Sequence, residues 1–235
     1  MKVAIVGATS AIAQEVARLY AAEGAELFLV ARDEAKLAPV AADLRVRGAA
    51  SVETFLADLA TRDHDAKLVA SAGAPDVVLI AHGELPDQQA IEADPSAQAR
   101  AFDVNATSFI SLAAHFANVL RAGSVLALIG SVAGDRGRRS NYTYGAAKAA
   151  VDTYCQGLRA RLAPSNVAVV LIKPGWVDTP MTAGIRKNLL FASASSAAAS
   201  IKRAITSRSA IAYVPFYWRW ISLVVRMLPS RLVKF

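Results

Sequence analysis

Short apolar runs alternate with longer segments of helical periodicity along nearly the whole chain. Most of the runs are continuously apolar, which is typical of strands buried on both faces of a sheet. The runs cover residues 2–6, 26–31, 51–56, 76–80, 124–130, 166–172 and 211–214. The segments between them follow a helical repeat at 11–23, 33–46, 61–72, 97–121, 142–162 and 193–207. The pattern therefore predicts strands and helices in regular alternation.

Such alternation is typical of a parallel sheet with right-handed crossovers and helices on both faces. No linker rich in Pro, Ser or Gly divides the chain, and no internal repeat is apparent. We predict an α/β fold with a doubly wound, parallel, seven-stranded sheet in a single domain over residues 1–215, followed by a tail over 216–235. Ligands of such sheets bind beyond the carboxyl ends of the strands, so polar residues at strand ends are the first candidates for a site.

The composition fits a globular domain and narrows the choice of partners. Hydrophobic residues make up 54% of the 235 positions, and the formal net charge is +7. A basic balance suits an anionic cofactor, a membrane surface or nucleic acid. Nucleic-acid binding needs a basic face with stacking aromatics, whereas the arginines here cluster between Ser131 and Tyr144 and in the tail, so we expect no nucleic-acid partner. Cys155 is the only cysteine and the histidines show no ligand spacing, so we expect neither a disulfide nor a metal site.

The start of the chain shows no secretory pattern. Met1 and Lys2 run directly into the apolar stretch 3–6, with no charged segment followed by a long apolar segment and a cleavage site. We expect the protein in the cytoplasm or bound peripherally to the cytosolic face of a membrane.

Tyr144, Lys148 and Ser131 form the strongest candidate for chemistry. Tyr144 and Lys148 stand four residues apart in a predicted helix, so they share one helix face. A phenol with a pKa of about 10 is a poor acid–base group at neutral pH, and a nearby lysine can stabilise its anion. Ser131 follows the predicted strand 124–130 and can hydrogen-bond the same reacting oxygen. The three residues predict a proton-transfer site, although Tyr and Lys at this spacing also occur on ordinary helix surfaces.

The ends of the first two strands predict a nucleotide cofactor. Gly7 can make a tight turn, and the free N–H groups of the helix that follows can bind a phosphate, with Thr9 and Ser10 as hydroxyl donors. An ordinary turn capped by Thr or Ser is the alternative. The second strand ends at Arg32, and an arginine can pair with a 2′-phosphate where an acidic residue would bind ribose hydroxyls. We therefore predict NADP(H), with NAD(H) as the alternative.

Taken together, these motifs resemble the short-chain dehydrogenase/reductase family over about residues 2–214. The family pattern has a Gly-rich turn, Asp-Leu after the third strand, a helix Asn, then Ser, Tyr-x-x-x-Lys and Pro-Gly. The matching residues are Gly7, Asp58, Leu59, Asn105, Ser131, Tyr144, Lys148, Pro174 and Gly175. The resemblance implies a Rossmann fold and an NAD(P)(H)-dependent oxidoreductase that interconverts a carbonyl and a secondary alcohol by hydride transfer.

The resemblance also implies a role for each residue of the site. Tyr144 would transfer the proton, Lys148 would hold the nicotinamide ribose and lower the pKa of the tyrosine, Ser131 would orient the substrate oxygen, and Asn105 would hold a water. The implied cofactor residues are Gly7, Thr9, Ser10, Ile12, Arg32, Asp58, Leu59, Ala81, Gly83, Tyr144, Lys148, Pro174, Val177 and Thr179.

Two departures from the family pattern concern the cofactor. Ala11 and Ala13 replace the second and third glycines of the first turn, and each adds a methyl group where backbone approaches the pyrophosphate or the strand. The turn after the fourth strand reads Ala81-His82-Gly83 and lacks the two asparagines of the family. Ala11 and Ala13 leave a nicotinamide-binding regulator without catalysis as an alternative, against which the intact Ser131, Tyr144 and Lys148 argue.

The stretch from Ser131 to Tyr144 points to a substrate. It resembles the keto-sugar reductases that act with the decaprenylphosphoryl ribose 2′-epimerase, which implies a lipid-linked keto-sugar. A lipid, a sterol or another apolar carbonyl compound is the alternative. The loop contains Arg136, Arg138 and Arg139, which can bind a phosphate through paired hydrogen bonds or can pair with neighbouring helices or a partner subunit.

The tail is aromatic and apolar, with Arg219, Ser222 and Arg226 on one narrow helical stripe. Two arginines make it a poor membrane-spanning helix. An amphipathic helix on an anionic membrane surface fits the pattern, with Arg231 and Lys234 adding attraction. A helix that covers the substrate pocket or packs in an oligomer fits it equally. We also expect a homo-oligomer.

Overall fold

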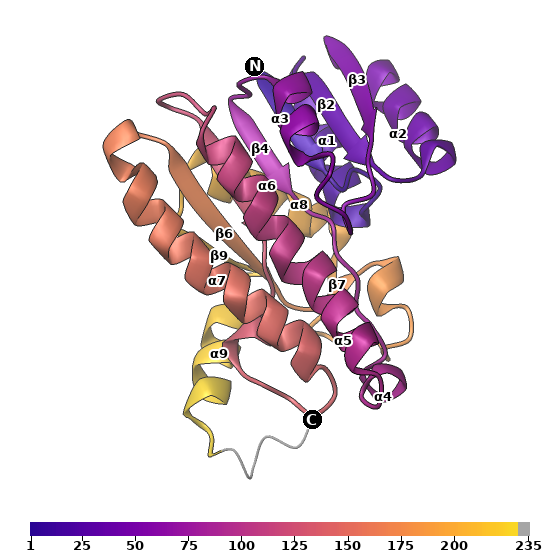
Figure 1. Cartoon of the computed structure of the whole chain (residues 1–235), viewed down its shortest axis with the longest axis vertical. Helices are drawn as coiled ribbons and strands as arrows, with labels where there is room; N and C mark the ends of the chain where they lie inside the picture. The colour runs from indigo at the N-terminus through magenta and orange to yellow at the C-terminus, as the bar shows by residue number, and fades with distance from the viewer. Residues whose placement is uncertain (230–235) are drawn as a thin grey trace.

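The computed structural model describes residues 1–229 and centres on one parallel seven-stranded sheet (Figure 1). The strands are β1 (Lys2–Val6), β2 (Glu26–Ala31), β3 (Ser51–Leu56), β4 (Val77–Ile80), β5 (Val125–Ile129), β6 (Ala168–Pro174) and β9 (Ile211–Val214). Their order across the sheet is β3-β2-β1-β4-β5-β6-β9. Every predicted strand is present within two residues of its predicted bounds, so the doubly wound fold is confirmed.

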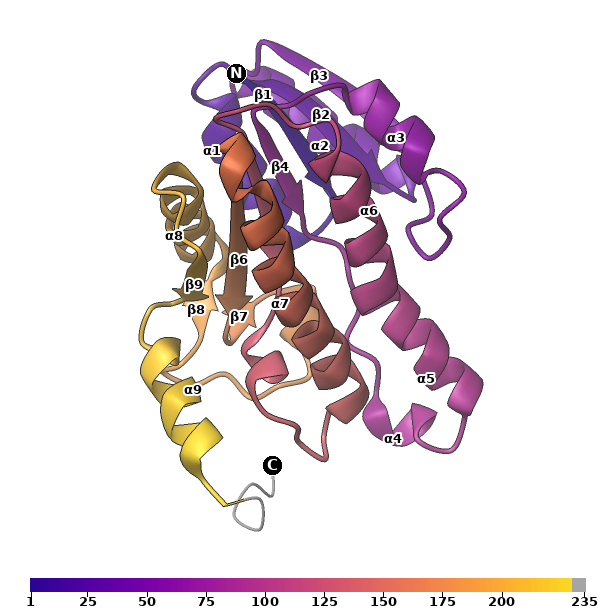
Figure 2. The ribbon, with the colours of Figure 1, turned by 60° about the vertical axis from the view of Figure 1, so that its left-hand side comes forward.

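Helices cover both faces of the sheet (Figures 1 and 2). They are α1 (Ala11–Ala21), α2 (Glu34–Val46), α3 (Asp65–Ala72), α6 (Ser108–Ala117), α7 (Tyr142–Leu162) and α8 (Ala194–Thr206). Val3 and Ile5 of β1 share a core with α1, α2 and α8, whereas Ala4 and Val6 share a core with α3, α6 and α7. Successive side chains of a strand point to opposite faces. The continuous apolar run of β1 is therefore explained by burial on both sides.

The predicted helix 97–121 differs in detail from the structure. It forms as α5 (Pro95–Phe102) and α6, joined by a π-helical stretch at Asp103–Thr107, and it ends at Ala117. A π-helical turn of this kind is often found at functional sites, and this one contains Asn105. One short α-helix and two short strands were not predicted, because each is too brief to show a period: α4 (Gln88–Ile91), β7 (Val177–Asp178) and β8 (Ala192–Ser193).

The order of the strands reverses between β1 and β4. After β3 the chain crosses to the other side of β1 and continues as β4. Doubly wound sheets bind ligands in the crevice at this point, outside the carboxyl ends of the strands. Gly7, with φ +85, lets the turn after β1 lie against the turn after β4, since a Cβ there would lie 2.5 Å from the nitrogen of His82. Both turns therefore border the same crevice.

The tail contains the helix α9 (Trp218–Met227), which follows β9. Figures 1 and 2 show it at the lower end of the molecule, apart from the helices that cover the sheet. Within residues 1–229, no helix has both the length and the apolar character needed to cross a bilayer. Arg231 and Lys234 lie outside the described residues.

Candidate active site

A cleft of about 420 Å³ lies where the carboxyl ends of the strands meet. It brings together every predicted site residue except Asn105. These are Gly7, Thr9, Ser10, Ile12, Arg32, Asp58, Leu59, Ala81, Gly83, Ser131, Tyr144, Lys148, Pro174, Val177 and Thr179.

Ser131 and Tyr144 approach each other because the turn after β5 packs tightly against α7. A Cβ at Gly145 would lie 2.9 Å from the carbonyl oxygen of Ala133, so the helix contacts this turn without an intervening side chain. The Oγ of Ser131 accepts a hydrogen bond from the nitrogen of Ala133 at 3.0 Å, which orients it. Burial raises the pKa of Tyr144 to about 12, and its hydrogen bond with Ser131 partly offsets this rise. The tyrosine is therefore protonated at neutral pH.

Lys148 is buried one helical turn further along α7. Its side chain donates from Nζ to the carbonyl oxygen of Ile129 at 3.1 Å, and Nζ lies 5.7 Å from the centre of the Tyr144 ring. Burial lowers the pKa of Lys148 to about 7. A lysine with this pKa is only partly charged at neutral pH. The predicted lowering of the Tyr144 pKa by Lys148 is consequently not seen, because the burial of the phenol dominates.

Asn105 is fully buried behind the cleft rather than in its lining. Its Nδ2 donates to the carbonyl oxygen of Ala101 at 2.9 Å, and its Oδ1 accepts from the nitrogen of Glu84 at 3.1 Å. A Cβ at Gly83 would lie 2.8 Å from this Oδ1 and 3.7 Å from Nζ of Lys148. Asn105 therefore ties the turn after β4 to the helical layer next to the lysine, and its predicted water stays a prediction.

His82 occupies the turn where the family has an asparagine, and it also lines the cleft. Its ring packs against Phe109 with 4.2 Å between ring centres. The hydroxyl of Ser108 donates to the carbonyl oxygen of Val104, so the Nε2 of His82, 2.7 Å from that hydroxyl oxygen, must be the donor in their contact. Nδ1 is then unprotonated, and it has no partner among the described residues. Burial, with a smaller effect from Lys148, lowers the pKa of His82 to about 3, so the ring is neutral.

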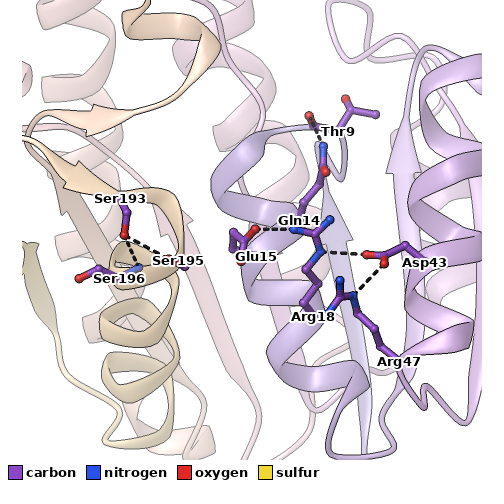
Figure 3. Close-up of polar contacts among 9 residues, drawn as sticks. All are labelled: Thr9, Gln14, Glu15, Arg18, Asp43, Arg47, Ser193, Ser195 and Ser196. Atoms are coloured by element: carbon purple, nitrogen blue, oxygen red, sulfur yellow. Dashed lines mark hydrogen bonds and ion pairs between the residues drawn. The ribbon is translucent and has the colours of Figure 1, made fainter. Parts of the chain in front are cut away.

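The turn after β1 fits the phosphates of a dinucleotide. Ser10 at the start of α1 makes no side-chain cap, so the N–H groups of the first helical turn can bind an anion. The side chain of Gln14 donates to the carbonyl oxygen of Thr9 at 3.1 Å and holds the turn in place (Figure 3). Ala13 is fully buried in the core between α1 and the sheet, so the loss of the third glycine is accommodated there. Ala11 lines the cleft, where the second glycine of the family pattern would stand.

Arg32 presents a cation at the end of β2. It is exposed, lines the cleft and has no salt-bridge partner among residues 1–229. Its neighbour Asp33 is occupied elsewhere, because its carboxylate caps α2 by accepting from the nitrogen of Lys36 at 3.1 Å. The guanidinium of Arg32 is therefore available to an anionic ligand.

The three arginines of the loop between Ser131 and Tyr144 have different surroundings. Arg136 donates from Nη2 to the carbonyl oxygen of Leu228 at 3.1 Å, at the end of α9. Arg139 is exposed, whereas Arg138 lines the cleft and has a buried Nε without a partner in the described part of the chain. Asn141 also lines the cleft, and its buried Oδ1 is equally unpaired within those residues. Of the three arginines, Arg138 is the one that lines the cleft.

The tail helix packs behind one wall of the cleft, where the sequence had left a pocket cover as one of several alternatives for the tail. A Cβ at Gly175 would lie 2.1 Å from the indole of Trp218. Trp176, which lines the cleft, meets Trp218 edge-on with 5.5 Å between ring centres. The hydroxyl of Tyr217 donates to the carbonyl oxygen of Leu190 at 3.2 Å. The Pro-Gly turn after β6 is thus backed by α9.

Comparison with known proteins establishes the family. The sequence pattern of the short chain dehydrogenases matches residues 1–190. The chain belongs to this family. Among its relatives, an uncharacterized oxidoreductase of Mycobacterium tuberculosis is 35% identical over 233 residues, covering 97% of this chain and 93% of the relative. An uncharacterized oxidoreductase of Streptomyces coelicolor is 33% identical over 236 residues, covering 98% of this chain and 93% of the relative.

Solved structures support the short-chain dehydrogenase fold. The crystal structure of BdcA in complex with NADPH superposes with a TM-score of 0.80 at 19% identity, covering 90% of this chain and 91% of BdcA. A putative dehydrogenase from Burkholderia cenocepacia with bound NADP superposes with a TM-score of 0.82 at 19% identity, covering 90% of each chain. At these identities the likeness shows the fold alone. Membership of the family makes the protein an oxidoreductase, in agreement with the predicted nicotinamide cofactor.

Proposed function

We propose that the protein interconverts a carbonyl and a secondary alcohol by hydride transfer with NADP(H). The proposal rests on one observation: Ser131, Tyr144 and Lys148 line the same cleft as the phosphate-binding turn after β1. The nicotinamide, when bound, supplies the hydride chemistry, while the protein supplies position and electrostatics. Residues 7–12, Arg32 and the Pro-Gly turn would hold the cofactor along the crevice.

Tyr144 would donate a proton to the carbonyl oxygen during reduction and accept one during oxidation. Its pKa of about 12 keeps the phenol protonated at neutral pH, which suits the donor role. Ser131, oriented by the nitrogen of Ala133, would donate to the same oxygen. The Nζ of Lys148 donates one hydrogen bond to Ile129 and retains further donor capacity for ribose hydroxyls. Asn105 would support this lysine from behind.

Arg32 supports a preference for NADP(H) over NAD(H). Its guanidinium lies on the cleft without a carboxylate partner among the described residues, while Asp33 caps α2. An arginine binds a phosphate through paired hydrogen bonds, whereas ribose hydroxyls call for an acidic residue. Two solved structures of this fold hold NADPH or NADP, which favours the same cofactor.

The lining of the cleft favours a substrate with both a polar and an apolar part. Arg138 and Asn141 offer an unpaired donor and an unpaired acceptor, whereas Trp176, Met181 and Ile185 offer apolar surface. A lipid-linked keto-sugar would offer polar groups to Arg138 and Asn141 and an apolar chain to the apolar residues. The apolar residues favour a second candidate, a reductase of lipid, sterol or other apolar carbonyl compounds. A regulator without catalysis is disfavoured by the intact set of proton-transfer residues.

We further propose that a lipid-linked substrate is met at the cytosolic face of a membrane, through residues 216–235. The expected homo-oligomer remains a prediction, which light scattering of the purified protein tests.

Turnover of Tyr144→Phe tests the proposed reaction. We expect this variant to lose turnover by about a hundredfold or more in a panel of carbonyl compounds, because the proton donor is removed. Its NADPH affinity, measured by fluorescence titration, should stay near that of the wild type. Tyr142→Phe, at an exposed position two residues earlier, is the matched control and should keep full turnover. Unchanged turnover in Tyr144→Phe would contradict the proposal.

A further inference from the structure

Helix α9 presents an apolar stripe to the surroundings of the protein. Trp220, Leu223, Val224 and Met227 are 57%, 46%, 55% and 70% exposed, and they stand at the i, i+3, i+4, i+7 spacing of one helix face. Phe216, just before the helix, is 76% exposed. We call these five residues the α9 face. A soluble surface does not ordinarily gather large apolar side chains in one contiguous group.

The opposite side of α9 is attached to the body of the protein. Trp218 and Ser222 are the buried residues of the helix. Trp218 packs on Gly175, and the guanidinium of Arg136 binds the carbonyl oxygen of Leu228 at the end of the helix. Turning the apolar stripe inward would break these contacts. The outward direction of the α9 face is therefore built into the fold.

The charge on α9 itself has one sign. Residues 218–227 include no Asp or Glu, and their only charged side chains are two arginines. Arg219 and Arg226 are exposed on α9 itself. A partner of this surface must be apolar where it meets the stripe and anionic beside it.

A second copy docked symmetrically through α9 does not meet that description. A symmetric dimer through α9 would place each copy's Arg219 and Arg226 near the same residues of the other copy, with no acidic side chain on the helix to offset them. An anionic bilayer offers acyl chains to the stripe and negative headgroups to the arginines. Helices with an apolar face and flanking basic residues lie in such an interface.

We propose that α9 docks the protein on an anionic lipid bilayer through the α9 face, with Arg219 and Arg226 at the headgroups. This names the residues of the membrane contact proposed above, and it does not depend on the reaction.

Docking would also place the cleft near the lipid. The segment 181–190 carries Met181 and Ile185, both of which line the cleft and are partly exposed, and Leu189, which is fully exposed. Tyr217 joins this segment to α9 through the carbonyl oxygen of Leu190. Apolar surface therefore extends from the wall of the cleft toward the docking helix.

Co-sedimentation of the full chain with vesicles tests the proposal. One set of vesicles is pure phosphatidylcholine and the other contains phosphatidylglycerol as well. The variants are Trp220→Ser with Leu223→Ser, and Arg219→Gln with Arg226→Gln. Val46→Ser, which removes an apolar side chain that is 88% exposed on α2, is the matched control. Thermal unfolding of each variant confirms folding without reference to activity.

We expect the wild type and Val46→Ser to bind the anionic vesicles, and both double variants to bind them roughly tenfold more weakly or worse. Emission of Trp220, isolated as the difference between the wild type and the double serine variant, should shift to the blue on binding. Absence of binding to anionic vesicles would overturn the proposal, as would equal binding by the double serine variant. A dimer in solution that this variant dissociates, without vesicle binding, would identify a second copy as the occupant instead. Turnover plays no part in these readouts, so failure here is distinguishable from failure of the proposed reaction.

Discussion

The Nζ of Lys148 lies 3.9 Å from the centre of the Phe109 ring, and the same ring packs against His82. A cation over an aromatic face is attracted by the ring, but burial has the larger effect and lowers the pKa of Lys148 to about 7. Lys148 therefore gains or loses its proton within the physiological pH range. That places a titrating group at the centre of the candidate site.

The pH dependence of turnover should report this lysine. We expect kcat/KM to fall as the pH rises above about 7, because neutral Lys148 loses a donor and its positive charge. In Lys148→Arg, the guanidinium stays protonated, so this inflection should disappear even if overall activity is lower. The exposed Lys187→Arg is the control. An inflection near pH 7 that persists in Lys148→Arg would assign it to another group.

His82 should make the protein sensitive to acid. Its folded pKa of about 3 lies below the ordinary value of 6.5, so below pH 6.5 the unfolded chain binds a proton that the folded protein excludes. Stability should therefore fall as the pH falls from 6.5 toward 3, by up to about 1.4 kcal/mol per pH unit. In His82→Asn, the free energy of unfolding measured with urea should depend less on pH between 6.5 and 3. The exposed His64→Asn is the control, and the same loss of pH dependence in that variant would exclude a specific role for His82.

Arg32 should govern the choice of cofactor. We expect Arg32→Ala to weaken NADPH binding by about tenfold to a hundredfold, because a charge-assisted contact to the 2′-phosphate is lost. NADH binding should change little, since NADH lacks that phosphate. Arg47→Ala, an exposed arginine paired with Asp43 on α2, serves as the control. If Arg32→Ala weakened the binding of NADPH and NADH equally, Arg32 would not bind the 2′-phosphate.

Arg138 should contribute to the recognition of anionic substrates. Its buried Nε lacks a partner among the described residues, so an anionic group of the substrate would satisfy it. We expect Arg138→Met to lower kcat/KM for phosphorylated or carboxylated carbonyl compounds by about tenfold or more, and to spare neutral ones. The matched control is Arg139→Met, at an exposed position in the same loop. Parallel losses for charged and neutral compounds would contradict the assignment.

Gly175 should be required for the packing of α9 against the turn after β6. Gly175→Ala places a methyl group where the indole of Trp218 lies, so Trp218 must move or the protein loses about 1–3 kcal/mol of stability. Near-ultraviolet circular dichroism and urea unfolding measure both effects. Gly184→Ala, at a position with nothing within 4 Å of the added carbon, should leave both unchanged. A wild-type spectrum and stability in Gly175→Ala would show that α9 is not held by this contact.

Strands and catalytic motifs were predictable because they depend on local pattern. The buried strands are continuous apolar runs, and Gly7, Arg32 and Ser131 follow such runs closely, so chain order already placed them at one edge of the sheet. Tyr144 and Lys148 were found by their spacing in the helix that follows. The helix around Asn105 was harder, because a π-helical stretch keeps an apolar pattern that periodicity does not distinguish from an α-helix. A four-residue helix or a two-residue strand is too short to show a period.

The differing surroundings of the loop arginines show why chain order is not enough. Arg136, Arg138 and Arg139 look equivalent in sequence, yet Arg136 binds the end of α9, Arg138 lines the cleft and Arg139 is exposed. The contact of Arg136 depends on α9, which lies about ninety residues later in the chain. Long-range contacts of this kind have no local signature.

The amino-acid sequence was enough to predict the doubly wound sheet and the residues that line the candidate site, since hydrophobic pattern and motif spacing act over short stretches. Tertiary structure alone decided the protonation states, the loop arginine that lines the cleft and the outward direction of the α9 face. Those properties arise from burial and from contacts between distant segments, as when Trp218 rests on Gly175 and Lys148 is enclosed beside Phe109. A pKa or an exposed face depends on everything packed around a residue, and that environment exists only in the folded chain.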